Sequence, residues 1–158
     1  MVPEIMEKPE MILAGIVASS ANVSELDIAG LWDRFILESA KLPYQVDEEK
    51  AYEVHVEEER KPKMHFCLIG VEVDRVNVLP LEFFHKVIPS GPYAVFTHHF
   101  KDGGYGEAFK AAYDWLKTSA YDSAYAFDIQ CYDSRFKGTE DPDSVFEVWI
   151  PVRLKSDA

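Results

Sequence analysis

A single carboxylate interrupts the most apolar segment of the chain. Between residues 145 and 152 the sequence is Val-Phe-Glu-Val-Trp-Ile-Pro-Val, and Glu147 is its only charged residue. Alternation along a strand places Val145, Glu147 and Trp149 on one face, so the carboxylate lies beside an indole. Burial of a carboxylate is costly unless it is protonated, hydrogen-bonded or paired with a cation. Glu147 is therefore a candidate for binding a cation.

The same segment also fits an edge strand whose Glu147 side faces water. Pro151 supports this alternative, because a proline removes one donor from the hydrogen-bond ladder. In the first interpretation Glu147 attracts a cation by charge and Trp149 attracts it through its ring face. In the second, Glu147 is an ordinary surface residue, and the sequence leaves both interpretations open.

Aromatic residues are unusually abundant, at 13% of the chain. Trp and Tyr combine a large apolar surface with a polar group, which suits them to lining a binding pocket. The side chains that we expect around such a pocket, besides Glu147, are Trp149, Trp32, Tyr113 and Tyr125. Weaker candidates are Tyr52, Tyr93 and Tyr105. Each is equally compatible with a position in an ordinary core.

The elements that must position these side chains form two similar series. The first comprises a strand over 10–18, a helix capped by Ser24 and stopped by Pro43, and strands at 52–56 and 65–73 joined by a charged turn at 59–63. The second comprises a long strand over 84–100, a helix after Gly104, and strands over 125–132 and 144–154.

The order strand, helix, strand, strand thus occurs twice at a period of about eighty residues. It predicts one α+β domain over residues 1–158, with halves at about 10–80 and 83–155. We expect a pseudo-symmetric antiparallel sheet with its helices on one face. A central groove between the halves is the natural place for a ligand pocket.

Composition excludes several classes of function. The chain of 158 residues has 28 acidic and 16 basic side chains, a formal charge of -12, which disfavours direct binding of nucleic acid. Its apolar runs are too short for a membrane span, and its N-terminus lacks the basic start of a secretion signal. Cys67 and Cys131 are expected to be reduced core residues, which with these features predicts a cytoplasmic protein.

No metal or cofactor is expected. His98 and His99 are adjacent, so on a strand they point to opposite faces, and His55, His65 and His85 show no ligand spacing along the chain. The glycines at 103, 104 and 106 lack the lysine and hydroxyl of a phosphate-binding loop.

Four segments resemble one family. They are residues 141–152, with Ser144, Glu147, Trp149 and Ile-Pro-Val; Leu31-Trp32-Asp33-Arg34-Phe35; residues 88–96; and Tyr132-Asp133-Ser134-Arg135-Phe136. In this order they resemble the GyrI-like small-molecule-binding domains, which are related to the effector-binding domains of multidrug-responsive transcription regulators. The resemblance implies an aromatic pocket with a central glutamate, matched by Glu147, for lipophilic and often cationic ligands. No helix-turn-helix segment is present, so the resemblance covers the effector-binding part alone.

Three functions are compatible with this resemblance. The first is a stand-alone sensor or sequestering module for hydrophobic or cationic small molecules. The second is a hydrolase in which Glu147 helps to add water to cyclopropane-type DNA-alkylating compounds, as the resemblance to some stand-alone relatives implies. The third is a gyrase-inhibitor-like protein that acts through its acidic surface. The ligand and the oligomeric state cannot be read from the sequence.

Overall fold

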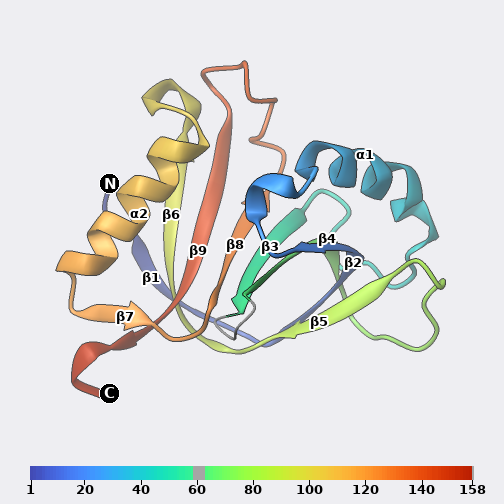
Figure 1. Ribbon diagram of the computed structural model, residues 1–158, viewed down its shortest axis with the longest axis horizontal. Helices are drawn as coiled ribbons and strands as arrows, with labels where there is room; N and C mark the ends of the chain where they lie inside the picture. The colour runs from blue at the N-terminus through green and yellow to red at the C-terminus, as the bar shows by residue number, and fades with distance from the viewer. Residues whose placement is uncertain (59–62, 158) are drawn as a thin grey trace. The chain divides into compact units, whose positions relative to one another are not determined.

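The computed structural model describes residues 1–58 and 63–157 (Figure 1). It divides into two compact units, a first unit over Glu10–Pro89 and a second unit formed by Met1–Pro9 and Ser90–Ala158. The predicted turn at 59–63 falls largely outside the described residues. Each unit is an antiparallel sheet with one long α-helix, which confirms the predicted α+β class.

In the described part of the first unit there are four strands and helix α1. Its elements are β2 (Met11–Ser20), α1 (Ile28–Glu38), β3 (Ala51–Glu58), β4 (Met64–Val73) and β5 (Phe84–Ile88). The strand order is β3-β4-β2-β5, and β3 and β4 form the predicted hairpin. Leu31 and Phe35 of α1 are buried in one core with Ile16, Cys67 and Ile69 from the sheet.

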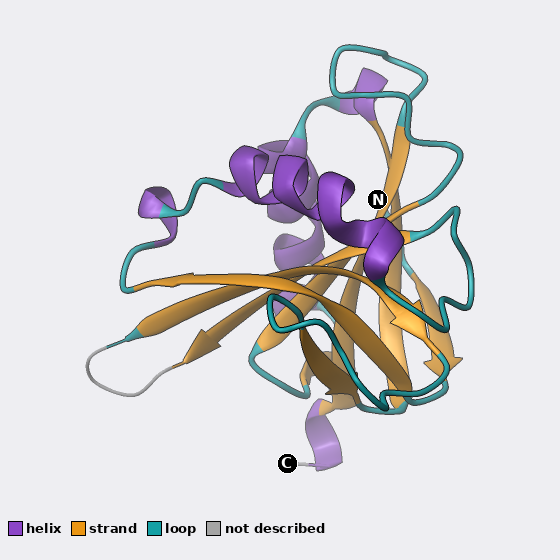
Figure 2. Cartoon of the chain, turned by 90° about the vertical axis from the view of Figure 1, so that its right-hand side faces the viewer, coloured by secondary structure: helices purple, strands orange, loops and turns teal. Residues whose placement is uncertain are grey.

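The second unit repeats this arrangement. Its elements are β1 (Glu4–Lys8), β6 (Gly91–His99), α2 (Tyr105–Thr118), β7 (Tyr121–Ser123), β8 (Phe127–Tyr132) and β9 (Val145–Leu154). The order β1-β6-β9-β8 matches β5-β2-β4-β3 strand for strand, and short β7 pairs with the end of β9. In both units the long helix follows one strand, β2 or β6, and precedes a pair of strands, β3 and β4 or β8 and β9; the helices are purple in Figure 2. The predicted repeat is therefore confirmed; the central groove stays a prediction.

The structure corrects the expected strand over 84–100. This segment forms two strands, because residues 89–90 belong to neither strand and Gly91 has a positive φ of 143°. β5 pairs with β2, whereas β6 pairs with β1 and β9. Two short strands, β1 and β7, were not predicted. Each series therefore has an outer strand, β5 or β1, that immediately precedes the other series in the chain.

The start of the first helix also differs from the prediction. Ser24 lies in a short 3-10 turn, Val23–Glu25, and the N-cap of α1 is Asp27, whose carboxylate accepts a hydrogen bond from the backbone of Gly30. Asp and Ser serve equally well as N-caps, so the two positions could not be separated by residue type. α1 ends at Glu38, before Pro43, and a second 3-10 turn follows at Ser39–Lys41.

Candidate functional site

Glu147 lies in a central strand. β9 pairs with β6 on one side and β8 on the other, and Glu147 is opposite both Thr97 and Cys131. The edge-strand alternative is therefore wrong. Pro151 is accommodated because β8 pairs with residues 147–149 and β7 with residues 152–154, so the proline falls between the two ladders. The Glu147 side chain is 19% exposed, so solvent still reaches a mostly buried carboxylate.

The carboxylate of Glu147 has a donor on each oxygen. The indole N–H of Trp149 donates to Oε1 at 2.8 Å, and Nη2 of Arg135 donates to Oε2 at 2.9 Å. Arg135 also donates to Asp133 at 2.8 Å, and these two carboxylates raise the pKa of its guanidinium. The group of Asp133, Arg135 and Glu147 thus carries a net charge of about -1 when all three are ionised.

Trp149 contacts a cation from its own chain. The Lys8 ammonium lies 4.1 Å from the centre of the indole ring, a cation–π contact, and Tyr93 meets the same indole edge-on at 6.3 Å. Tyr93 is fully buried, and burial, with a smaller effect from Tyr125, raises the pKa of its phenol to about 12. We call the surface that carries these side chains the Glu147 face; its members on strands are Tyr93, Val95, Thr97, Ile129, Cys131, Glu147 and Trp149.

Tyr125 lies at the margin of the Glu147 face. It precedes β8, is 51% exposed, and stacks on Phe127 at 5.8 Å. Alternation along β8 puts Phe127 on the same side as Ile129 and Cys131, so Tyr125 stacks at the edge of the Glu147 face. Of the predicted set, the structure therefore brings Glu147 and Trp149 into contact and places Tyr125 beside the same face, and it adds Tyr93, which was a weaker candidate.

Tyr113 belongs to the opposite face of the same sheet. Its hydroxyl donates to Asp128 at 2.6 Å. Alternation along β8 places Asp128 on the other side from Ile129 and Cys131, which belong to the Glu147 face. The helix α2 covers that opposite side, where its Trp115 contacts Phe96 at 5.5 Å. The second unit thus does not bring Tyr113 and Glu147 together on one face.

Trp32 lies in the first unit and is hydrogen-bonded to a different carboxylate, that of Glu53. Its indole N–H donates to Oε1 of Glu53 at 2.6 Å. The Glu53 side chain is 7% exposed, so it is buried more deeply than that of Glu147. Sequence reasoning assigned Glu53 to the polar side of an alternating strand and missed it. One signal in the sequence could have identified Glu53. Trp32 lies on the apolar side of the preceding helix, and that side must pack against one face of the strand.

Residues 4–152 match the model of a family described as integron-associated effector binding protein. The chain belongs to this family. The transcriptional regulator BrlR of Pseudomonas aeruginosa is 28% identical to it over 150 residues, which cover 94% of this chain. Those residues cover 54% of BrlR, so the effector-binding chain spans about half the length of this relative.

Two solved structures have the same fold as this effector-binding chain. An integron cassette protein from the mobile metagenome of Vibrio cholerae is 20% identical, with a TM-score of 0.67 and 96% of each chain covered. SAV2435, whose structure contains bound tetraphenylphosphonium, is also 20% identical, with a TM-score of 0.72 and coverage of 97% and 94%. The family match identifies an effector-binding domain, and the two structures show that its fold is shared. Among residues 1–58 and 63–157, no helix is long and apolar enough to cross a membrane.

Proposed function

We propose that the chain binds lipophilic organic cations at the Glu147 face. The contact between Lys8 and Trp149 carries this proposal, since an ammonium group at 4.1 Å already fits against the indole ring. The same indole donates to Glu147, which holds the ring in place and adds a negative charge beside it. A ligand cation would thus meet a ring face and a carboxylate together, and each contributes attraction.

The charges around Glu147 support exchange of one cation for another. Arg135 is 43% exposed, and an ion pair of such an exposed group is worth only about 0.2–1 kcal/mol. A ligand that buries its apolar groups against the Trp149 ring, in the place of Lys8, gains an additional hydrophobic contribution that Arg135 and Lys8 lack. We therefore expect a lipophilic cation to displace these two side chains more readily than a small inorganic cation does.

The ligand of SAV2435 supports the same class of compound. Tetraphenylphosphonium is a bulky aromatic cation, and SAV2435 shares the fold of this chain over nearly its whole length. BrlR is a transcriptional regulator, so an effector-binding role within a sensor agrees with that relative. A stand-alone sensor or sequestering module remains our proposal for this chain, while the hydrolase and gyrase-inhibitor alternatives stay predictions without a supporting contact.

The test compares a cation with a neutral compound of similar shape. Methyltriphenylphosphonium and triphenylphosphine oxide are titrated into the protein by calorimetry, with tryptophan fluorescence as a second signal. In Glu147→Gln we expect affinity for the phosphonium to fall about ten- to hundredfold, because a charged pair is worth roughly 1.5–3 kcal/mol. Affinity for the oxide should change little, since the amide keeps the shape of the side chain.

Two further variants make the test specific. Arg135→Met removes the competing cation, and we expect phosphonium to bind about two- to fivefold more tightly. Asp128→Asn removes a carboxylate from the opposite face of the same sheet and should leave both affinities unchanged. Equal losses for both compounds in Glu147→Gln, or a loss in Asp128→Asn as large as in Glu147→Gln, would contradict a specific role of Glu147.

A further inference from the structure

Four side chains of types that can bind a metal ion lie on one face of the β3–β4 hairpin. Glu53 and His55 are two residues apart on β3, and His65 and Cys67 are two residues apart on β4, so each pair points to one side. His55 is directly opposite Cys67 in the ladder, which places both pairs on the same side. This is the side covered by α1, because Cys67 belongs to the core that contains Leu31 and Phe35.

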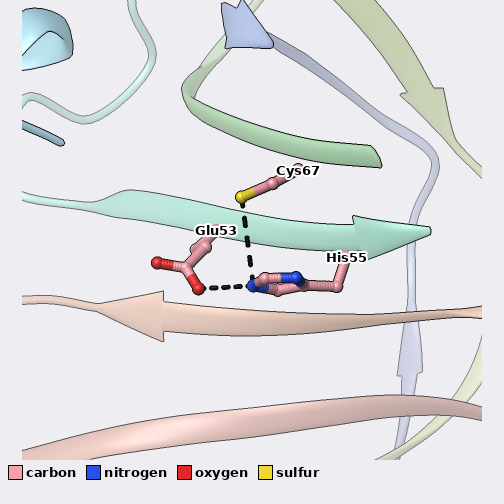
Figure 3. A group of neighbouring side chains, drawn as sticks. All are labelled: Glu53, His55 and Cys67. Atoms are coloured by element: carbon pink, nitrogen blue, oxygen red, sulfur yellow. Dashed lines mark hydrogen bonds and ion pairs between the residues drawn. The ribbon is translucent and has the colours of Figure 1, made fainter. Parts of the chain in front are cut away.

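The side chains converge on one ring nitrogen (Figure 3). Nε2 of His55 lies 2.5 Å from Oε2 of Glu53 and 3.9 Å from Sγ of Cys67. The three ligand atoms of Glu53, His55 and Cys67 all lie within 4.8 Å of one another. Zinc bonds of about 2.0–2.3 Å in tetrahedral geometry separate neighbouring ligand atoms by about 3.3–3.6 Å. Displacements of about 1 Å would therefore fit the three atoms around one ion.

This convergence differs from the arrangement of a catalytic cysteine. A catalytic cysteine is accompanied by a histidine as base and a carboxylate that orients the histidine. In that arrangement the cysteine contacts one nitrogen of the histidine and the carboxylate contacts the other. Here Glu53 and Cys67 approach the same nitrogen, Nε2. Cys67 is also fully buried, which keeps its sulfur from a substrate. Atoms directed at one point are typical of ligands around an ion.

We propose that Glu53, His55 and Cys67 bind a divalent transition metal ion of the zinc type. One oxygen, one nitrogen and one sulfur donor suit a borderline-soft ion, and three protein ligands leave a fourth position for water or another group. This site shares no residue with the cation site proposed on the Glu147 face. It also departs from the expectation of no metal, which considered histidine spacing along the chain and not pairing across the hairpin.

Neighbouring groups orient two of the three ligands. The Trp32 indole N–H donates to Oε1 of Glu53, which leaves Oε2 directed at His55. Nδ1 of His55 lies 2.8 Å from Nε2 of His65. With an ion on Nε2, His55 carries its proton on Nδ1 and donates to His65, which takes the place of the carboxylate, carbonyl or water that usually accepts from a metal-binding histidine. The side chain of His55 is 16% exposed, so an ion can approach from its side.

Cobalt(II) is the probe for this site. We expect the full chain to bind one equivalent of Co²⁺ with ligand-field absorption of a tetrahedral site and a thiolate-to-cobalt charge-transfer band, with Zn²⁺ displacing it. Cys67→Ala should lose the charge-transfer band and bind Co²⁺ at least about tenfold more weakly. Cys131→Ala, the matched control, removes the other buried cysteine and should bind Co²⁺ as the wild type does.

Two variants keep the test decisive if Cys67→Ala fails to fold, which circular dichroism would reveal. Glu53→Gln retains an acceptor for Trp32, and His65→Gln changes the outer hydrogen bond and leaves the three ligands in place; we expect affinity to fall in both, by about 10–100-fold in His65→Gln. Wild-type binding without a thiolate band, unchanged affinity in these variants, or absence of stoichiometric binding would overturn the proposal. Loss of binding at high salt in every variant alike would indicate ions held by the acidic surface, and would also overturn it.

Discussion

At the level of single residues, both mostly buried carboxylates discussed above are paired with an indole. Glu147 accepts from Trp149 in the second unit, and Glu53 accepts from Trp32 in the first. An indole N–H stabilises a carboxylate without adding a charge, so the negative charge stays available to a cation. At Glu147 that cation is Arg135 in this structure; we propose a ligand cation in its place.

The buried phenol of Tyr93 predicts a loss of stability in alkaline solution. Its pKa is raised to about 12, whereas a tyrosine in the unfolded chain titrates near 10. Between these values the unfolded chain loses a proton that the folded chain keeps, so the free energy of unfolding falls as pH rises from about 10 to about 12. Tyr93→Phe should flatten this fall, as measured by urea unfolding at a series of pH values. An unchanged slope in the variant would assign the fall to other groups.

At the level of elements, the two outer strands are exchanged between the series. β1 precedes β2 in the chain but pairs with β6, and β5 precedes β6 but pairs with β2. Each series thereby obtains a fourth strand beside its first one. Periodicity within β5 and β6 indicates strands in both, yet it holds no information on their partners, which is why one long strand was predicted there.

A glycine pair sets the spacing of β2 and β4. Gly15 is opposite Gly70, and a Cβ on Gly15 would lie 1.8 Å from the carbonyl oxygen of Ile69. Gly15→Ala must therefore displace backbone, and we expect the free energy of unfolding to fall by about 3 kcal/mol or more. Gly106→Ala is the matched control, because a Cβ there meets open space on α2 and should raise stability by about 0.5–1 kcal/mol. Comparable urea midpoints for the two variants would contradict the close contact.

At the level of the whole molecule, charge determines which partners are attracted. A formal charge of -12 repels the phosphates of nucleic acid and attracts cations over long range at low salt. Both proposals agree with this sign, since one ligand is an organic cation and the other a metal ion. Selection between them comes from the local groups, an aromatic ring at Trp149 and soft donors at Cys67 and His55.

The same charge predicts no binding to duplex DNA. Lys and Arg residues bind a phosphate backbone by releasing its counterions. The chain has only 16 of these residues and 28 acidic ones. We expect no mobility shift of a duplex at submicromolar protein and physiological salt. A shift that weakens as salt is raised would show a basic surface that the net charge conceals.

Much of this protein follows from the sequence alone. Apolar periodicity predicts the two helices and most of the strands, because local side-chain burial sets a period of 3.6 or 2 residues. The repeat follows from element order, and the likeness of four segments to one family anticipates the family found. Glu147 can be identified from the sequence because a charged side chain in an apolar strand needs a partner wherever the strand lies. Trp149 can be identified with it because it lies two residues later, on the same face of that strand.

The tertiary structure determined which residues these side chains contact. Arg135 is 12 residues from Glu147 and Lys8 is 141 residues from Trp149, and neither distance along the chain reveals a contact. The pairing of His55 with Cys67 depends on the register of a hairpin, in which a shift of one residue would turn every side chain of one strand to the other face. A sequence states which side chains can bind a cation or a metal ion, but strand register and helix packing determine which of them meet.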